Sequence, residues 1–199
     1  MSPQTLVAAV VSTYWASVML MSIRSWLKFG VPSGSLPKTR LEKRMWMIWV
    51  PTIIAWVIFS WQFHESALTP HFAMVLKWVF AAGAVAAFLL TVGCWIKMGR
   101  NWSMAVRPDK KTALITDGAF SSVRHPIYSL SLALMICTVV VVQSWPMLLV
   151  GTIHCSMLVV KSLNEEQYLT QMHGQEYMNY LARTNRFIPI RAFAKTRSI

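Results

Sequence analysis

Residues 126–160 decide the fold, and they read PIYSLSLALMICTVVVVQSWPMLLVGTIHCSMLVV. The stretch contains no Asp, Glu, Lys or Arg, and Gln143-Ser144-Trp145-Pro146 divides it into two apolar segments, residues 127–142 and 146–160. Crossing about 30 Å of hydrocarbon takes roughly 20 helical residues, so each segment is short for a membrane span. Because proline interrupts a helix, we predict a tight helical hairpin whose ends reach the membrane interface rather than one long helix.

Three longer apolar segments precede this hairpin, at residues 5–23, 45–63 and 72–96, and Lys77 is the only charged residue within them. The 199-residue chain is 55% hydrophobic and only 13% charged, whereas soluble domains are about 25% charged. The composition predicts an all-α, polytopic membrane protein with about five transmembrane helices. We expect residues 1–199 to form a single membrane domain, in which residues 1–63 supply two N-terminal spans.

The basic residues alternate along the chain between segments that are rich in them and segments that lack them. Residues 24–44, 97–126 and 161–199 each contain six Lys or Arg, whereas residues 1–4, 64–71 and 143–145 contain none. Cytoplasmic loops of membrane proteins are enriched in Lys and Arg. The pattern predicts an external N-terminus and a cytoplasmic C-terminus, and it explains the net charge of +12 by membrane topology, without a nucleic-acid partner.

The densest group of chemically useful residues is Ser122-Val-Arg-His-Pro-Ile-Tyr128. Pro126 suits the first position of a helix and disfavours a helical conformation at His125, so we expect His125 to be the N-cap. A helix N-terminus flanked by Arg124 and His125 is an anion site, with the Tyr128 hydroxyl at the same rim. The alternative is structural: an interfacial arginine, a proline that begins a span, and a tyrosine of the aromatic belt.

Two adjacent carboxylates, Glu165 and Glu166, follow the last apolar segment. Carboxylates at a membrane exit are costly unless they have partners or face water. Either they cap a further helix over residues 164–173, because acids favour a first turn, or they bind a cationic or polyhydroxyl ligand. Gly174 is expected to end that helix. The residues after Gly174 are expected to form an amphipathic helix, with Tyr177, Met178 and Leu181 on its apolar side.

The order of these motifs resembles the isoprenylcysteine carboxyl methyltransferase family and the related phospholipid methyltransferases. The residues that carry the resemblance are Gly99-Arg-Asn101-Trp102-Ser, Asp117-Gly-Ala-Phe-Ser-Ser-Val-Arg-His-Pro-Ile-Tyr128, Glu165-Glu166, Gly174-Gln-Glu-Tyr177 and Arg186-Phe-Ile-Pro189. Together they extend over residues 99–190, about half of the chain. The Arg-His-Pro-x-Tyr motif alone is moderately specific, whereas the full series on both sides of a helical hairpin is specific.

The resemblance implies an integral-membrane methyltransferase that uses S-adenosylmethionine, with a catalytic core over residues 72–199 and a cofactor site formed by residues 97–128 and 161–190. It assigns cofactor binding to Arg124, His125, Ile127, Tyr128, Glu165 and Glu166. Arg183, Arg186 and Glu165 are the predicted catalytic residues, with one of the arginines orienting the acceptor, and Asn101 and Trp102 are predicted to contact the substrate. The chain after Arg183 is expected to close the cofactor site.

The predicted acceptor is a lipophilic or lipidated molecule that enters from the bilayer, with a carboxylate, as in isoprenylcysteine, favoured over the amine of a phospholipid or a thiol. No metal is expected. Two other classes of function stay open from the sequence: a membrane NADPH-dependent reductase of the sterol-reductase type, and a non-enzymatic membrane subunit.

Overall fold

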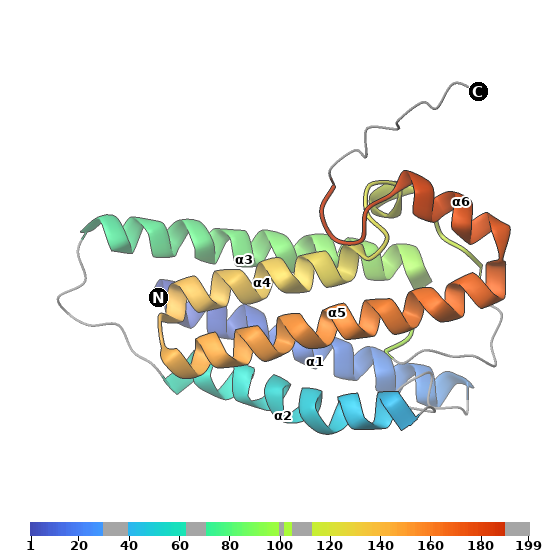
Figure 1. Ribbon diagram of the computed structural model, residues 1–199. Helices are drawn as coiled ribbons and strands as arrows, with labels where there is room; N and C mark the ends of the chain where they lie inside the picture. Colours follow the sequence, from blue (N-terminus) through green and yellow to red (C-terminus); the bar gives the residue numbers. More distant parts are fainter. Residues whose placement is uncertain (30–39, 63–70, 100–101, 105–112, 190–199) are drawn as a thin grey trace.

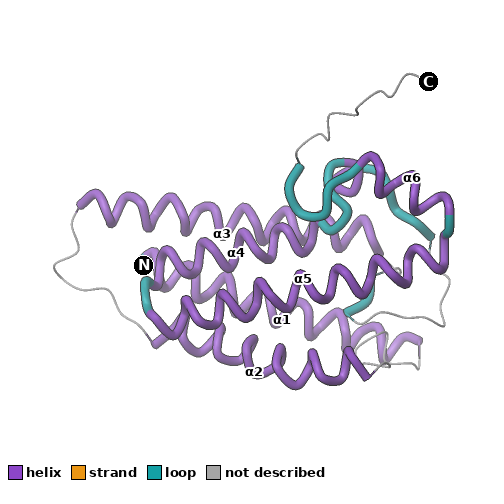
Figure 2. The backbone as a smooth tube through the Cα atoms, viewed as in Figure 1, coloured by secondary structure: helices purple, strands orange, loops and turns teal. Residues whose placement is uncertain are grey.

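The computed structural model describes residues 1–29, 40–62, 71–99, 102–104 and 113–189. Five long helices form a bundle, and a short helix lies across one end of it (Figure 1). Their bounds are α1 Pro3–Phe29, α2 Arg40–Gln62, α3 His71–Met98, α4 Pro126–Val142, α5 Trp145–His173 and α6 Gln175–Arg183, with a 3-10 turn, η2, at Gly118–Ser121. The described chain contains no strand, only one isolated parallel bridge between Val123 and Asn185 (Figure 2).

Successive long helices run in opposite directions, so that the N-terminus and the α4–α5 turn lie at one end of the bundle and α6 lies at the other (Figure 1). Helix α1 contacts α2, α3 and α4, while α5 contacts α2 and α4. Helices α1, α2, α3 and α5 are long and apolar enough to cross a membrane, and α4 is a shorter apolar helix of 17 residues. The predicted all-α polytopic membrane fold is confirmed, with four full-length candidate spans in place of five.

The predicted hairpin is present, and its turn has a clear local cause. Gln143 ends α4 in the left-handed region at φ 52°. The hydroxyl of Ser144 then caps α5 by accepting from the backbone N–H of Met147 at 3.3 Å. The two helices approach closely at Gly151, where an added Cβ would lie 3.0 Å from Val139 Cγ2. The turn and this close contact keep α4 and α5 side by side up to the other end of the bundle.

Helix α5 is longer than the sequence indicated. The prediction of a separate helix that begins at Asn164 is wrong, because α5 continues without a break from Trp145 to His173. Its 29 residues span about 44 Å, which exceeds a hydrocarbon core of about 30 Å. If Trp145 lies at one interface, the other is reached near Asn164. Glu165 and Glu166 therefore do not cap a helix but lie within α5, just beyond the hydrocarbon. Gly174 ends the helix as predicted, with φ 53°.

Hydrogen bonds among several buried polar side chains connect α2 to the α4–α5 hairpin. The indole N–H of Trp49 donates to His154 Nδ1 at 3.3 Å, and the other ring nitrogen of His154 lies 3.0 Å from the Ser131 hydroxyl. Trp56 packs against the same imidazole with 4.8 Å between ring centroids, and its indole N–H donates to the Thr138 hydroxyl at 3.2 Å. Polar groups inside a membrane are tolerated when neighbouring helices supply their hydrogen bonds. These side chains fix the α2–α4–α5 contact that supports one wall of the site described next.

Candidate functional site

The site lies where α4 begins, at the end of the bundle that carries α6. His125 is the N-cap of α4 and Pro126 occupies its first turn, as the sequence predicted. The tail packs directly on this point, because the backbone N–H groups of Arg124 and His125 donate to the carbonyls of Asn185 and Arg186 at 2.8 and 3.1 Å. Residues some 60 positions apart in sequence are therefore held together by backbone hydrogen bonds.

Glu166 is the centre of a cluster of charged side chains. Its Oε1 accepts from Arg124 Nε at 2.9 Å and from Arg186 Nε at 3.1 Å, and it lies 3.2 Å from His125 Nε2. Its Oε2 accepts from Arg186 Nη2 at 2.6 Å. The Glu166 side chain is 11% exposed, so these partners replace the water that its charge would otherwise need. We call these four residues the Glu166 cluster.

The predicted anion site at Arg124 and His125 is thus occupied by a carboxylate of the chain itself. The guanidinium of Arg124 also donates to the carbonyl of Thr184, which extends the cluster into the tail. The hydrogen bonds to Glu166 raise the pKa of Arg186 above its usual value. The cluster therefore joins the start of α4, α5 and the tail through hydrogen bonds and ion pairs.

Glu165 has a different environment from its neighbour. Its Oε2 accepts from the Tyr128 hydroxyl at 2.7 Å, its side chain is 31% exposed, and no described residue donates to its Oε1. The Tyr128 ring stacks on the His125 imidazole with 5.2 Å between centroids and 5° between planes. Of the two adjacent acids, Glu166 is enclosed by partners, and Glu165 retains an oxygen that is able to accept from a ligand.

Two further contacts fix the segment that leads into α4. Lys97, at the end of α3, forms an ion pair with Asp117 at 2.5 Å, and this hydrogen bond lowers the pKa of Asp117. Tyr180 of α6 donates to the carbonyl of Phe120 in η2 at 2.5 Å, and burial raises the pKa of Tyr180 to about 12. Tyr180 therefore remains a neutral donor at physiological pH, and α6 is held over the approach to α4.

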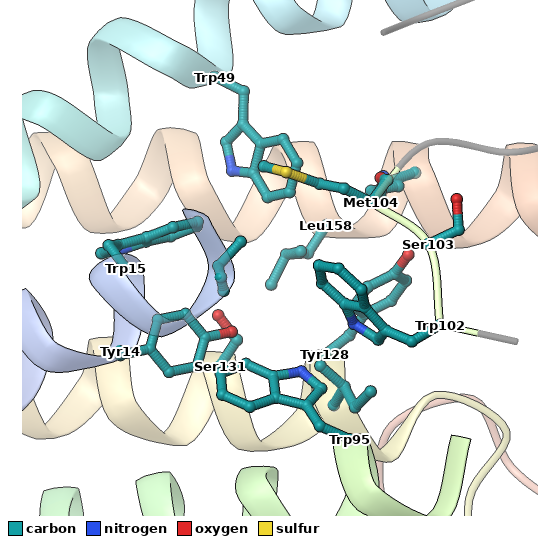
Figure 3. Close-up of a pocket in the computed structure, with 13 residues that line it drawn as sticks. Tyr14, Trp15, Trp49, Trp95, Trp102, Ser103, Met104, Tyr128, Ser131 and Leu158 are labelled. Carbon is teal, nitrogen blue, oxygen red and sulfur yellow. The ribbon is translucent and has the colours of Figure 1, made fainter. Parts of the chain in front are cut away.

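Figure 3 shows an aromatic pocket, which adjoins the polar cluster through Tyr128. It contains about 410 Å³ of empty space, including its open mouth. Indole and phenol rings from α1, α2, α3 and α4 surround it, and α5 contributes an aliphatic wall. The residues that line it are Tyr14, Trp15, Val18, Trp49, Trp95, Trp102, Ser103, Met104, Ile127, Tyr128, Ser131, Leu158 and Lys161. Tyr128 belongs to both regions, since its hydroxyl binds Glu165 and its ring lines the pocket.

The structure brings most of the residues singled out in the sequence to this end of the bundle. Arg124, His125, Glu166 and Arg186 form one cluster, Tyr128 binds Glu165, and Ile127 and Trp102 line the pocket. Arg183 is not among them, because it is exposed and its Nε donates to the carbonyl of Asn179 one turn earlier in α6. Asn101 lies outside the described residues.

Several pocket residues were missed by the sequence reasoning. Tyr14, Trp49 and Trp95 come from helices without a recognisable motif, and each alone reads as ordinary packing. The available signal was the large number of tryptophans in the apolar segments. Lys161 was assigned to the basic segment that follows the last span, but the structure places it inside the pocket wall.

The fold and the site together define an integral-membrane protein with a polar cluster and an aromatic pocket at one end of a helical bundle. The sequence profile of the isoprenylcysteine carboxyl methyltransferase (ICMT) family matches residues 78–171, from α3 through most of α5. The family predicted from the motifs is confirmed, and it indicates that the protein is an integral-membrane methyltransferase. No individual curated protein sequence matches the chain significantly.

Proposed function

We propose that this protein transfers a methyl group from S-adenosylmethionine to a lipophilic acceptor, with a carboxylate favoured as the accepting group. The observation that carries the proposal is the double role of Tyr128. Its hydroxyl donates to Glu165 at the polar end of the site, and its ring lines the aromatic pocket that reaches into the bundle. A water-soluble donor on one side and a lipophilic acceptor on the other would meet at this residue.

The residues of the polar side fit S-adenosylmethionine. Glu165 has a carboxylate oxygen with no described donor, which suits an ammonium group or a ribose hydroxyl. The Tyr177 hydroxyl is buried at the same end without a partner among the described residues. Aromatic faces such as that of Tyr128 attract cations, including a sulfonium. We assign the donor site to the surroundings of Glu165, Tyr128 and the Glu166 cluster.

The work left to the protein is mainly positioning. When bound, S-adenosylmethionine supplies a methyl group on a positively charged sulfur, which is open to attack by an oxygen, nitrogen or sulfur of an acceptor. A carboxylate acceptor is already ionised near neutral pH, so no side chain has to remove a proton. The Glu166 cluster fixes the start of α4 and the tail, and it thereby holds Tyr128 and Glu165 in place. Such preorganisation lowers the entropic cost of bringing two reactants together.

The nature of the pocket favours a lipophilic acceptor. Its walls are predominantly apolar, and α1, α2, α3, α4 and α5 all contribute to it. Ligand sites with apolar walls and a few polar groups bind molecules that hide hydrocarbon from water. We propose that the acceptor enters from the bilayer, places its chain among the aromatic rings and presents its head group near Tyr128.

Methyl transfer in a lipid nanodisc tests the proposal. The purified protein is incubated with methyl-labelled S-adenosylmethionine and, separately, with laurate, dodecylamine or dodecanethiol, which share one chain and differ in head group. We expect label to enter laurate in a form that alkali releases as methanol, because methyl esters hydrolyse and N-methyl or S-methyl groups do not. The Glu165→Gln variant should lose most of this activity. Glu176→Gln, an exposed acid of α6, serves as the matched control.

The outcomes separate the classes of function. Alkali-stable label in the amine or thiol would contradict the carboxylate preference but retain the methyltransferase. If no acceptor is labelled and the same preparation binds NADPH, the result would contradict a methyltransferase and favour a reductase.

A further inference from the structure

Lys161 occupies an unusual place for a lysine. It lies on α5 one turn before Glu165, and the residue is only 7% exposed to solvent. Its ammonium donates to the carbonyl of Met104 and lies 5.1 Å from the centre of the Trp49 ring. If Trp145 lies at one membrane interface, Lys161 lies within the hydrocarbon core, about one helical turn before the opposite interface.

Two opposing effects act on the Lys161 ammonium. Burial disfavours its charged form, whereas the nearby carboxylates of Glu165 and Glu42 favour it. Neither acid lines the pocket, and Glu165 already accepts from Tyr128. Of the described residues that line the pocket, Lys161 alone is charged. The pocket therefore presents one basic side chain within predominantly apolar and aromatic walls.

Some hydrogen-bond donors of the described pocket residues have no acceptor within the described part of the chain. An ammonium has three donors, and the contact with Met104 uses one of them. The indole N–H of Trp95, another pocket residue, is buried and has no partner among the described residues. Buried donors without acceptors cost free energy, so a cation and a free indole N–H in one pocket suit a ligand that carries an anionic acceptor group.

We infer that Lys161, together with the indole N–H of Trp95, binds the anionic head group of the proposed carboxylate acceptor. This inference rests on the proposed function and specifies its acceptor site. It gives Lys161 the orienting role that the sequence assigned to Arg183 or Arg186, since Arg186 is engaged by Glu166 and Arg183 is exposed at α6. An amine acceptor would be repelled by the same lysine.

Binding of laurate and of dodecanol, which differ only in the head group, tests the inference without any turnover. The quenching or shift of tryptophan fluorescence reports occupancy, because Trp15, Trp49, Trp95 and Trp102 surround the pocket (Figure 3). All proteins are compared at one concentration of a neutral detergent, so that partition into micelles is the same for each. We expect the wild type to bind laurate more tightly than dodecanol.

Four variants isolate the ammonium and the indole N–H. Lys161→Met should weaken laurate binding by roughly 10- to 150-fold, the effect of losing a charge-assisted hydrogen bond, and leave dodecanol binding unchanged. Lys161→Arg should restore the preference for laurate. Trp95→Phe, which keeps a ring but removes the N–H, should weaken laurate alone. Lys97→Met is the matched control, because Lys97 lies at the same end of the bundle but binds Asp117 outside the pocket.

The result that overturns the inference is equal binding of laurate and dodecanol to the wild type, or an undiminished preference for laurate in both Lys161→Met and Trp95→Phe. Competition with S-adenosylhomocysteine adds a second criterion. Laurate should still bind when that ligand is saturating, and mutual exclusion would assign the pocket to the cofactor instead. Failure of the wild type to bind S-adenosylhomocysteine, with the laurate preference intact, would refute the proposed function and not the anion site.

Discussion

Two adjacent glutamates, Glu165 and Glu166, differ in their exposure and in their hydrogen-bond partners. Glu166 is 11% exposed and receives hydrogen bonds from two arginines, whereas Glu165 is 31% exposed and keeps one oxygen without a described donor. An enclosed and saturated carboxylate contributes to structure, and a partly exposed one with spare capacity suits a ligand. Sequence adjacency gave no means of distinguishing them, since the partners Arg124 and Arg186 come from distant parts of the chain.

Glu166→Gln is expected to destabilise the protein strongly. The amide keeps the shape of the side chain but leaves Arg124 and Arg186 without a counter-charge, and breaking a buried ion pair costs about 3–5 kcal/mol. Thermal melting in detergent measures the effect, and Glu176→Gln, which removes an exposed acid outside the cluster, provides the reference. An unchanged melting temperature for Glu166→Gln would show that the cluster does not hold the tail and α4 together.

At the scale of elements, the start of α4 was predictable and the length of α5 was not. Pro126 imposes a local restriction on its neighbour, so the helix start could be located from a few residues. Lys161, Asn164, Glu165 and Glu166 suggested an exit from the membrane followed by a new cap. In the structure the side chains of Lys161, Glu165 and Glu166 bind other elements instead. Helix α5 continues through this point and presents the two glutamates to α4 and the tail.

The short tail segment after α6 is expected to be required for the cofactor site. Carbonyls of Thr184, Asn185 and Arg186 accept hydrogen bonds from Arg124 and His125, and Arg186 binds Glu166 directly. Deleting residues 184–199 should abolish binding of S-adenosylhomocysteine while the protein still inserts into membranes. Deleting only residues 190–199 retains every tail contact described here and should preserve binding. Normal binding after the longer deletion would reduce the tail to an interfacial anchor.

Across the whole molecule, charge patterning gave the arrangement of the helices but could not give their contacts. The five long helices alternate in direction, so all three basic segments begin or end on the side of the bundle that carries α6 (Figure 1). The hydropathy and charge of a segment can be read from its own sequence, without knowledge of how the helices pack. The aromatic pocket, by contrast, depends on which faces of five helices meet, and Trp49 and Trp95 had no local feature that would identify them as its walls.

The orientation of the protein follows from the same charge pattern. Because basic segments are retained in the cytoplasm, we predict an external N-terminus and a cytoplasmic C-terminus, with the site accessible to a cytoplasmic methyl donor. Reporter fusions at Ser2 and Ile199 measure this directly. A reporter that is active only outside the cytoplasm and functions at Ile199 would invert the topology and place the site away from the donor.

The most direct test of the central claim is calorimetric titration of S-adenosylhomocysteine into the detergent-purified wild type, Glu165→Gln and Glu176→Gln. We expect the wild type and Glu176→Gln to bind with the same affinity, and Glu165→Gln to bind roughly 10- to 150-fold more weakly because it loses a charge-assisted hydrogen bond. Wild-type affinity in Glu165→Gln would contradict the assignment of the site, and an absence of binding to the wild type would contradict the use of S-adenosylmethionine altogether.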